Sequence, residues 1–358
     1  MAQAHEHKLR VAVVGAGHLG QHHARVYAEM GDTVELVGVC DIDPARARQI
    51  ANRHDVPAYT EAEALLGRVD AVSIATPTES HYEVGRLFLE AGVAALIEKP
   101  LARTLEEAQA LCRAARASGA ALQVGHIERF NPALVACRRH LHDPRFISCD
   151  RVTPFSFRSA DIGVVLDLMI HDLDVVLHLA RGPVAEVEAM GVPVLTAHED
   201  IAHARLRFED GATAVLTASR VSVKRLRKIR VFQPDCYISL DYGERQAAIF
   251  RRRPGFRPGA DLFAELDPRG MDPAALQALV FSRFIEVEHV SMEDAEPLKL
   301  ELQSFVQAVR TGTEPEVPGA AGLRAMEVAD RIQAALLAQL ERERARAASR
   351  AAPGAETA

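Results

Sequence analysis

Three closely spaced glycines stand near the start of the chain, in the sequence Gly15-Ala-Gly17-His-Leu-Gly20. They follow a short apolar run and precede an amphipathic stretch, which is the setting of a dinucleotide-binding turn. Gly15 permits the tight turn, Gly17 lets the backbone approach a pyrophosphate, and Gly20 allows close packing of helix on strand. The N-terminus of that helix offers free N–H groups to phosphates. The spacing therefore predicts a dinucleotide site.

An acidic residue stands where such a site needs one. Asp41 follows Gly20 by 21 residues and ends the second predicted strand. A carboxylate at this place accepts hydrogen bonds from both ribose hydroxyls and repels a 2′-phosphate. We therefore expect NAD rather than NADP, although the neighbouring Arg46 and Arg48 leave NADP as the alternative.

Two further segments end predicted strands, Ala75-Thr-Pro-Thr78 and Glu98-Lys99-Pro100. Ligands of parallel sheets bind beyond the carboxyl ends of the strands. We expect both segments to face the nicotinamide end of the cofactor. Lys99 then lies where hydride chemistry would occur, and the alternative is that it is only a solvated charge.

Asp167 and His171 are four residues apart in a segment with helical periodicity, so they share one helix face. Asp174 is expected to continue this face one turn later. A histidine beside a carboxylate titrates near neutrality and suits removal of the proton of an alcohol. A simple surface pair is the alternative, and the dinucleotide motif in the same chain favours the catalytic interpretation.

The elements that position the first group of residues follow from the pattern of the first 125 or so residues. Short apolar runs alternate with amphipathic stretches, and a capping box at Thr104 and Glu107 opens a helix that is expected to end near Ser118. This pattern predicts a doubly wound parallel sheet whose strands cover residues 9–14, 34–40, 71–75, 94–97 and 122–124.

After Asn131 the pattern changes. Helices are expected at 132–141 and 163–179 and late in the chain at 300–309 and 322–340, with Asp210-Gly211 as a hairpin turn and a short helix opening at Asp272-Pro273. Residues 251–270 are expected to form an irregular loop. Strands are expected at 146–152, 201–208, 212–220, 228–233, 237–241 and 246–251.

The fold class is therefore α/β, with a Rossmann doubly wound parallel sheet and a C-terminal α+β domain that has a large open-faced, mostly antiparallel sheet. An uncovered sheet face would expose a large apolar patch, so we expect a second subunit to cover it. The predicted divisions are an NAD-binding domain over 1–127, a substrate-binding and oligomerisation domain over 128–341 and a disordered tail over 342–358.

Composition excludes several classes of function. The chain of 358 residues has a formal net charge of −7, so no overall field attracts nucleic acid or anionic lipid. Its five cysteines are widely spaced, which is typical of a reducing compartment and argues against a thiolate metal site. No apolar run approaches the length of a membrane helix, and the N-terminus does not resemble a signal peptide. We expect a cytoplasmic protein with no metal.

Taken in order, these motifs resemble the glucose-fructose oxidoreductase and inositol dehydrogenase family, written Gfo/Idh/MocA. The matching pieces are Gly15 to Gly20 with His23, Asp41, Ala75 to Thr78 with His81, Glu98 to Pro100, Asp167 to His171 and Pro315 to Asp330. The resemblance implies NAD(P)-dependent oxidation of sugar hydroxyls, assembly as dimers or tetramers through the open sheet, and catalytic roles for Lys99, Asp167 and His171. The cofactor-binding residues that it implies are Gly15, Gly17, His18, Leu19, Gly20, Asp41, Ile42, Ala75, Thr76, Pro77, Thr78, His81, Glu98, Lys99 and Pro100.

One segment is similar to a particular branch of the family. Many members carry an Asn-Arg-Arg-Phe run after the sixth strand, where this chain reads Gly125-His-Ile-Glu-Arg-Phe-Asn-Pro132 and keeps only the second arginine. That form resembles the branch that oxidises nucleotide-linked amino sugars, and most of all UDP-N-acetylglucosamine 3-dehydrogenases, whose keto product an aminotransferase converts for lipid A or surface polysaccharide (lipopolysaccharide) synthesis. The expected substrate-binding residues are Lys99, Glu128, Arg129, Asn131, Arg158 and His171, with Arg129 and Arg158 near the diphosphate.

Three questions stay open at this point. The proton acceptor is either His171 or Lys99, because a buried lysine with a lowered pKa also acts as a base. A dehydrogenase of a free polyol such as inositol would use the same groups. A noncatalytic NAD-binding regulator with the same fold is the third possibility, although it would have little reason to keep Lys99, Asp167 and His171 together.

Overall fold

The computed structural model describes residues 8–157, 162–180, 182–255 and 272–351. The chain forms two compact units. The first unit comprises Met1–Phe130, Leu173–His178 and Ala295–Arg331, and the second comprises Asn131–Asp172, Leu179–Asp294 and Ile332–Ala358. The first boundary lies three residues beyond the predicted one, and two later segments, Leu173–His178 and Ala295–Arg331, also belong to the first unit.

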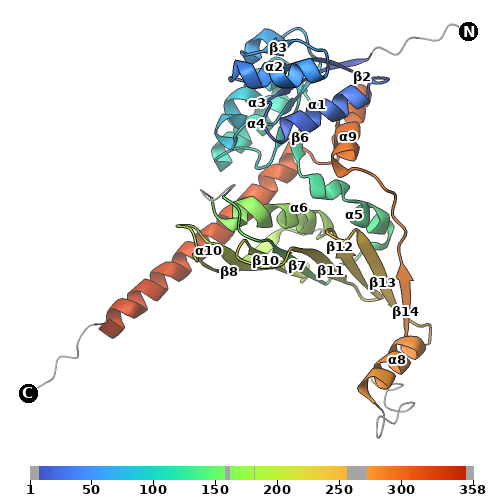
Figure 1. Ribbon diagram of the computed structural model, residues 1–358. Coiled ribbons are helices and arrows are strands. Elements are labelled where there is room, and N and C mark those ends of the chain that lie inside the picture. Colours follow the sequence, from blue (N-terminus) through green and yellow to red (C-terminus); the bar gives the residue numbers. More distant parts are fainter. Residues whose placement is uncertain (1–7, 158–161, 181, 256–271, 352–358) are drawn as a thin grey trace, which may run out of the picture. The chain divides into compact units, whose positions relative to one another are not determined.

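The first unit (Figure 1) contains a parallel sheet. Its strand order is β3-β2-β1-β4-β5-β6. Five of the strands confirm the prediction to within one residue. The short β3 was not predicted, since two residues carry no periodicity. The bounds are β1 Leu9–Val14, β2 Val34–Cys40, β3 Ala58–Tyr59, β4 Ala71–Ile74, β5 Ala94–Glu98 and β6 Leu122–Gly125.

Helices pack on this sheet through buried apolar side chains. The core contains Val13 of β1, Tyr27 of α1 and Phe305 of α9, each without exposed surface. The N-cap of α4 is Thr104 as predicted, and its side chain accepts from Glu107 N, while Glu107 Oε2 accepts from Arg103 N. The helices are α1 Gly20–Glu29, α2 Pro44–Arg53, α3 His81–Glu90, α4 Leu105–Ser118 and α9 Pro297–Thr311.

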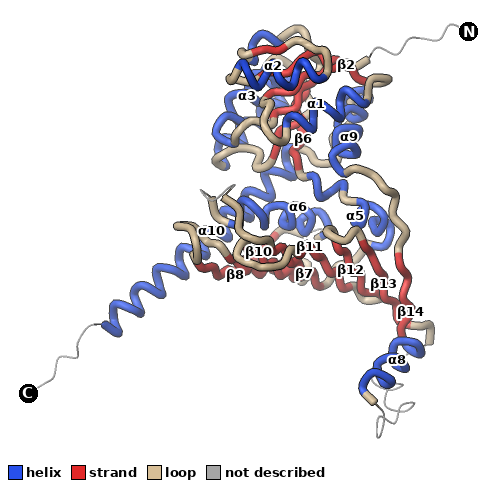
Figure 2. The backbone as a smooth tube through the Cα atoms, in the orientation of Figure 1, coloured by secondary structure: helices blue, strands red, loops and turns tan. Residues whose placement is uncertain are grey.

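The second unit contains an eight-stranded sheet in the order β14-β13-β12-β11-β7-β10-β9-β8 (Figure 2). Only β7 and β10 pair in parallel; the other neighbours are antiparallel, as predicted. Strands β8 and β14 were not predicted, because polar residues interrupt their alternation. The bounds are β7 Phe146–Val152, β8 Val184–Val192, β9 Ile201–Phe208, β10 Thr213–Ser219, β11 Leu226–Phe232, β12 Cys236–Asp241, β13 Gln246–Arg252 and β14 Ile285–His289.

Helix α5, Pro132–Cys137, packs on one face of this sheet against β12 and β13. Along β9 every second residue is buried, and the alternate ones, His203, Arg205 and Arg207, are exposed on the other face. Asp210 and Gly211 form the predicted hairpin turn: Gly211 has a φ of 86°, and Ala212 N donates to Asp210 Oδ1. The predicted open-faced sheet is therefore present.

The remaining helices extend or limit the predictions. Helix α8, Pro273–Phe284, begins after an Asp272 cap as expected, whereas most of the predicted 251–270 loop lies outside the described residues. Helix α10, Gly319–Ala351, continues well beyond the predicted end at residue 340, so the part of the predicted tail up to Ala351 is helical. No helix in the described part of the chain has the length and apolarity to cross a membrane.

Candidate functional site

The glycine turn connects β1 to α1 in the first unit. Gly15 has a φ of 95°, and its N–H donates to Cys40 O at 2.7 Å. A Cβ on Gly15 would lie 2.6 Å from the Ala75 carbonyl, and one on Gly20 would lie 1.7 Å from the Gly15 oxygen. Glycine is therefore required at both places, because any side chain would collide with backbone. Around Gly17 the space within 4 Å of a Cβ is empty of the described atoms, so a ligand can approach the backbone there.

Asp41 lies at the end of β2, directly beside this turn. Its Oδ2 accepts from Ala16 N at 2.8 Å and its Oδ1 accepts from Asp43 N at 2.9 Å. Each carboxylate oxygen has a second lone pair for a ribose hydroxyl. Arg46 approaches Asp41 to 3.6 Å and also Asp43 at the same distance. The next residue, Ile42, is 93% exposed and offers an apolar surface beside the carboxylate.

The loops after β4 and β5 are joined by His81. Its two ring nitrogens lie 3.0 Å from Thr76 O and 2.9 Å from Pro100 O. Burial lowers the pKa of His81, although both hydrogen bonds act in the opposite direction. His81 is 1% exposed, and its ring connects the two loops through these hydrogen bonds. Its contact with the cofactor stays a prediction. Thr76 Oγ1 is buried without a hydrogen-bond partner among the described residues, as expected of a group that awaits a ligand.

Lys99 follows a buried carboxylate at the end of β5. Glu98 Oε1 lies 3.1 Å from His23 Nε2, and Glu98 Oε2 accepts from Lys99 N at 3.3 Å. Burial opposes ionisation of Glu98, but the hydrogen bond and charge of His23 outweigh it, and the pKa of Glu98 is lowered. Gly125 allows this packing, since a Cβ there would lie 2.9 Å from Glu98 Oε2. Lys99 itself is half-buried, and its peptide bond to Pro100 is cis.

Sequence reasoning missed two buried polar residues of the first unit, His126 and Glu301. His126 is 1% exposed and Glu301 of α9 is fully buried, and neither side chain has a hydrogen-bond partner among the described residues. Burial lowers the pKa of His126. The charge of Asp174 acts in the opposite direction, and the charge of Lys99 lowers the pKa further. Burial, followed by the charge of Glu98, raises the pKa of Glu301 well above its ordinary value. Periodicity marks both positions only as core positions, so it gave no signal for them.

Arg129 is also buried, although the sequence suggested contact with a diphosphate. Its Nε and Nη2 donate to the two carboxylate oxygens of Asp174 at 2.7 and 3.3 Å, and both side chains are at most 5% exposed. Asp174 was expected to continue the helix face of Asp167 and His171; it is buried in the ion pair with Arg129, whereas Asp167 and His171 are partly exposed. A substrate contact of Arg129 stays a prediction; its Nη1 is buried and has no hydrogen-bond partner among the described residues. Glu128 is likewise buried, at 7% exposed.

Asp167 and His171 belong to the second unit, on a helix that begins at Val164. The segment Val165–Met169 (η5) is a π-helix and α6, Ile170–Leu179, follows it directly. Both side chains are partly exposed. The residue after His171, Asp172, is buried, and so is Asp174. Arg151 of β7 donates twice to Asp172, each bond 2.8 Å long, and so ties this helix to the sheet.

Two predicted substrate-binding residues of the second unit have different outcomes. The Asn131 side chain accepts from Ala133 N at 3.1 Å, and thus caps α5. Its predicted substrate contact stays a prediction. Arg158 lies outside the described residues.

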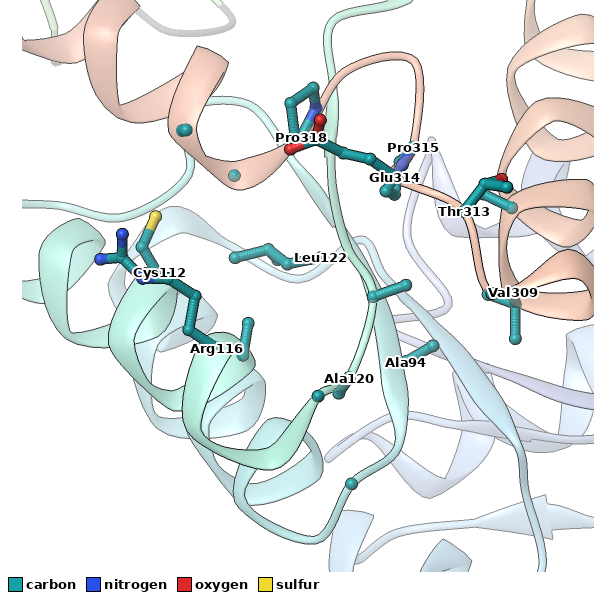
Figure 3. Close-up of a pocket in the computed structure, with 18 of the residues that line it drawn as sticks. Ala94, Cys112, Arg116, Ala120, Leu122, Val309, Thr313, Glu314, Pro315 and Pro318 are labelled. Atoms are coloured by element: carbon teal, nitrogen blue, oxygen red, sulfur yellow. The ribbon is translucent and has the colours of Figure 1, made fainter.

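A pocket in the first unit lies at the opposite edge of the parallel sheet from the glycine turn. It has a volume of about 580 Å³, and Ala94 and Leu122 line it where β5 and β6 begin (Figure 3). Cys112 and Arg116 of α4 face it from one side and Glu314 from the other. Cofactors of such sheets bind beyond the carboxyl ends of the strands, so this pocket is separate from the predicted site.

The residues at the carboxyl edge fit NAD on structural grounds. The glycine turn is open at Gly17, and α1 begins without a hydrogen bond from a side chain at its N-cap, Leu19. The Asp41 carboxylate borders the same turn and Thr76 presents an orphaned hydroxyl at the neighbouring strand end. These groups match the phosphates, a ribose and the nicotinamide end of a dinucleotide respectively.

Two family models match the chain. The model described as "Oxidoreductase family, NAD-binding Rossmann fold" matches residues 9–126, and the Gfo/Idh/MocA C-terminal domain model matches residues 134–236. Together they cover more than half of the sequence, and the first names NAD as the ligand of the site described above.

Proteins with similar sequences are also named as dehydrogenases. The chain is 36% identical over 335 residues to UDP-N-acetylglucosamine 3-dehydrogenase of Acidithiobacillus ferrooxidans, covering 93% of this chain and 99% of the relative. A solved structure of that enzyme superposes with a TM-score of 0.81 at 35% identity, covering 93% and 98% of the two chains. D-apiose dehydrogenase of Paraburkholderia graminis is 28% identical, over 90% and 86% of the chains. The chain is therefore an NAD-dependent oxidoreductase that belongs to the Gfo/Idh/MocA family.

Proposed function

We propose that this enzyme oxidises the C3 hydroxyl of UDP-N-acetylglucosamine to the 3-keto sugar. The observation that carries the proposal is the 36% identity to a UDP-N-acetylglucosamine 3-dehydrogenase along 99% of that relative. The Glu128 to Pro132 segment, which differs from the commonest family form, supports it. We further propose that an aminotransferase consumes the keto product in lipid A or surface polysaccharide synthesis, in the cytoplasm.

The cofactor supplies the chemistry that the side chains lack, because NAD accepts the hydride of the carbinol carbon when it is bound. The chain contributes the N–H groups at Gly17 and at the start of α1, which bind phosphates, and the Asp41 carboxylate, which accepts from ribose hydroxyls. His81 holds the loops of Thr76 and Pro100 in place. These residues fix the direction from which the sugar must approach.

Proton removal falls to the second group of residues. We propose that His171 accepts the C3 hydroxyl proton and that Asp167 orients its ring and stabilises the imidazolium. Lys99 then binds the reacting oxygen and stabilises the negative charge that develops there. Exchange of the roles of Lys99 and His171 is the second form of this mechanism. The Glu98 carboxylate, which is hydrogen-bonded to His23, supports the Lys99 backbone in either form.

We also propose that the open face of the eight-stranded sheet forms a subunit interface. Aromatic side chains cross this face on adjacent strands: Phe232 and Tyr237 stack with centroids 4.6 Å apart, and Tyr237 and Phe250 with centroids 4.9 Å apart. Phe146 and Phe232 are 38% and 37% exposed. Burying such a row in a homodimer or homotetramer removes apolar area from water.

The proposal is tested by following NADH absorbance with a panel of substrates. UDP-N-acetylglucosamine is expected to give the highest kcat/KM, with inositol and glucose far lower. Addition of a partner aminotransferase together with an amino donor such as glutamate draws off an unfavourable keto product. Turnover of inositol or glucose above the sugar nucleotide would indicate a polyol dehydrogenase, and NAD binding without reduction by any sugar would indicate a regulator.

A further inference from the structure

The helix that carries Asp167 and His171 begins irregularly. Asp167 N donates to Gly163 O, four residues back, whereas Ile170 N donates to Val165 O, five residues back. A π segment inserts one residue per turn and turns the side chains that follow it to a new direction, and such segments are frequent at functional sites. The direction of His171 therefore depends on whatever fixes the start of this segment.

Glu199, in the β8–β9 connection, fixes that start. Its Oε1 accepts from Val165 N at 3.2 Å, and its backbone oxygen accepts from Val164 N at 3.0 Å. The first N–H groups of a helix have no partner within the helix, and a carboxylate placed there satisfies them and favours the positive end of the dipole. The cap comes from a residue 34 positions away in sequence.

Gly163 leaves the space that this carboxylate occupies. A Cβ at Gly163 would lie 1.9 Å from Glu199 Oε1 and 2.1 Å from its Cδ. The adjacent residue, Asp200, anchors the same connection: it is fully buried, its Oδ2 accepts from three successive backbone N–H groups, and its Oδ1 lies 3.5 Å from Arg220 Nε. Glu199 is thus held firmly enough to impose its position on the helix.

We propose that Glu199 is a positioning residue for the reaction: through the space left by Gly163 it caps the π segment and so sets the direction of Asp167 and His171. The inference rests on the proposed function of His171. Glu199 touches neither substrate nor cofactor in this role, and its effect passes through the backbone of Val164 and Val165.

The test compares wild type with Glu199→Gln, Glu199→Ala, Gly163→Ala and the double variant, and Glu209→Ala, at an exposed glutamate of the β9–β10 turn, is the control. Glutamine keeps an acceptor for Val165 N, so kcat should stay within about threefold of wild type. Glu199→Ala should lower kcat roughly 10- to 100-fold, because a displacement of about 1 Å at a catalytic group has that effect. In Glu199→Ala the affinity for NAD should not change, whereas the pH profile of kcat/KM should shift.

Gly163→Ala should reproduce the loss by displacing the Glu199 carboxylate. In the Glu199→Ala background the same substitution has little left to displace, so the double variant should be no worse than Glu199→Ala alone. Additive losses would overturn the role of Gly163. If Glu199→Ala does not fold, Glu199→Gln and Gly163→Ala decide the question, and equal kcat in these two variants would overturn the proposal.

Hydrogen exchange of the 164–170 segment separates this inference from the proposed function. Exchange should accelerate in Glu199→Ala and not in Glu199→Gln. Faster exchange with kcat and pH profile equal to wild type would overturn the positioning role and leave a merely stabilising cap. If the wild-type enzyme fails to reduce NAD with any of the sugars, the proposed function is overturned. If hydrogen exchange is unchanged in Glu199→Ala, the capping role of Glu199 is overturned.

Discussion

Lys99 and His171 are the side chains on which the proposed chemistry depends. Lys99→Met and His171→Ala are each expected to lower kcat by roughly 10² to 10⁴, because each removes a group that acts on the proton or charge of the transition state. NAD affinity, measured by calorimetry, should stay near wild type, since the glycine turn and Asp41 hold the cofactor. His178→Ala, an exposed histidine of the same helix, is the control. A parallel loss of NAD affinity and kcat would contradict the assignment.

Glu301 gives a prediction for the pH dependence of stability. Because burial and nearby charge raise the pKa of Glu301, the folded state holds its proton more tightly than the unfolded state, whose value is near 4.5. Its favourable contribution is complete below that pH and is lost as the pH rises toward the raised value. Glu301→Gln removes the ionisation, so the variant should gain stability over wild type as the pH rises from 5 to 8. Urea unfolding at both pH values measures this, and Gln303→Glu on the exposed side of α9 is the control.

A constant difference between Glu301→Gln and wild type across that pH range would show that Glu301 ionises as readily in the folded protein as in the unfolded one. The sequence could not have suggested this residue, because a glutamate at a core position of a helix is recognised only once the partners around it are known.

At the scale of elements, the β8–β9 connection depends on Asp200. Three backbone N–H groups, the Thr196 hydroxyl and Arg220 surround its carboxylate. Burial opposes ionisation, yet the backbone hydrogen bonds lower the pKa of Asp200 to about 2. Asp200→Ala leaves Arg220 buried without this partner and should reduce the free energy of unfolding by roughly 3–5 kcal/mol at pH 7. Thr196→Val, which removes one hydrogen bond to Asp200, should cost only about 1 kcal/mol.

Because the pKa of Asp200 is lowered, its contribution is present above the unfolded value near 3.8 and is lost as the pH falls toward 2. Denaturant titrations of wild type and Asp200→Ala should therefore converge at low pH. Equal sensitivity of Asp200→Ala and Thr196→Val at pH 7 would contradict the central place of this carboxylate.

Elements with strong periodicity were predictable and those fixed by long-range contacts were not. Strands β1 and β2 match the predicted bounds because both are short, largely apolar runs. The π segment at Val165–Met169 was not predictable, since its cap comes from Glu199 in a distant connection. The same reason applies to Asp174, because the partner that buries its carboxylate, Arg129, lies 45 residues earlier in the chain.

At the scale of the whole molecule, the open sheet face predicts self-association. Light scattering should give the mass of a dimer or tetramer at micromolar concentration. Phe232→Glu places a charge within the aromatic row and should shift the mass toward the monomer, whereas Val223→Glu, at an exposed site in the β10–β11 connection, should not. A wild-type monomer, or equal behaviour of the two variants, would contradict the proposed interface.

The division of labour between the two units is the central claim: one binds NAD and the other supplies the group that takes the alcohol proton. The most direct measurement uses UDP-N-acetylglucosamine with deuterium at C3 and follows the label by mass spectrometry. The account predicts that wild type forms singly deuterated NADH together with an unlabelled 3-keto sugar, and that His171→Ala forms both far more slowly. Retention of deuterium in an oxidised sugar, or oxidation of inositol in preference to the sugar nucleotide, would contradict it.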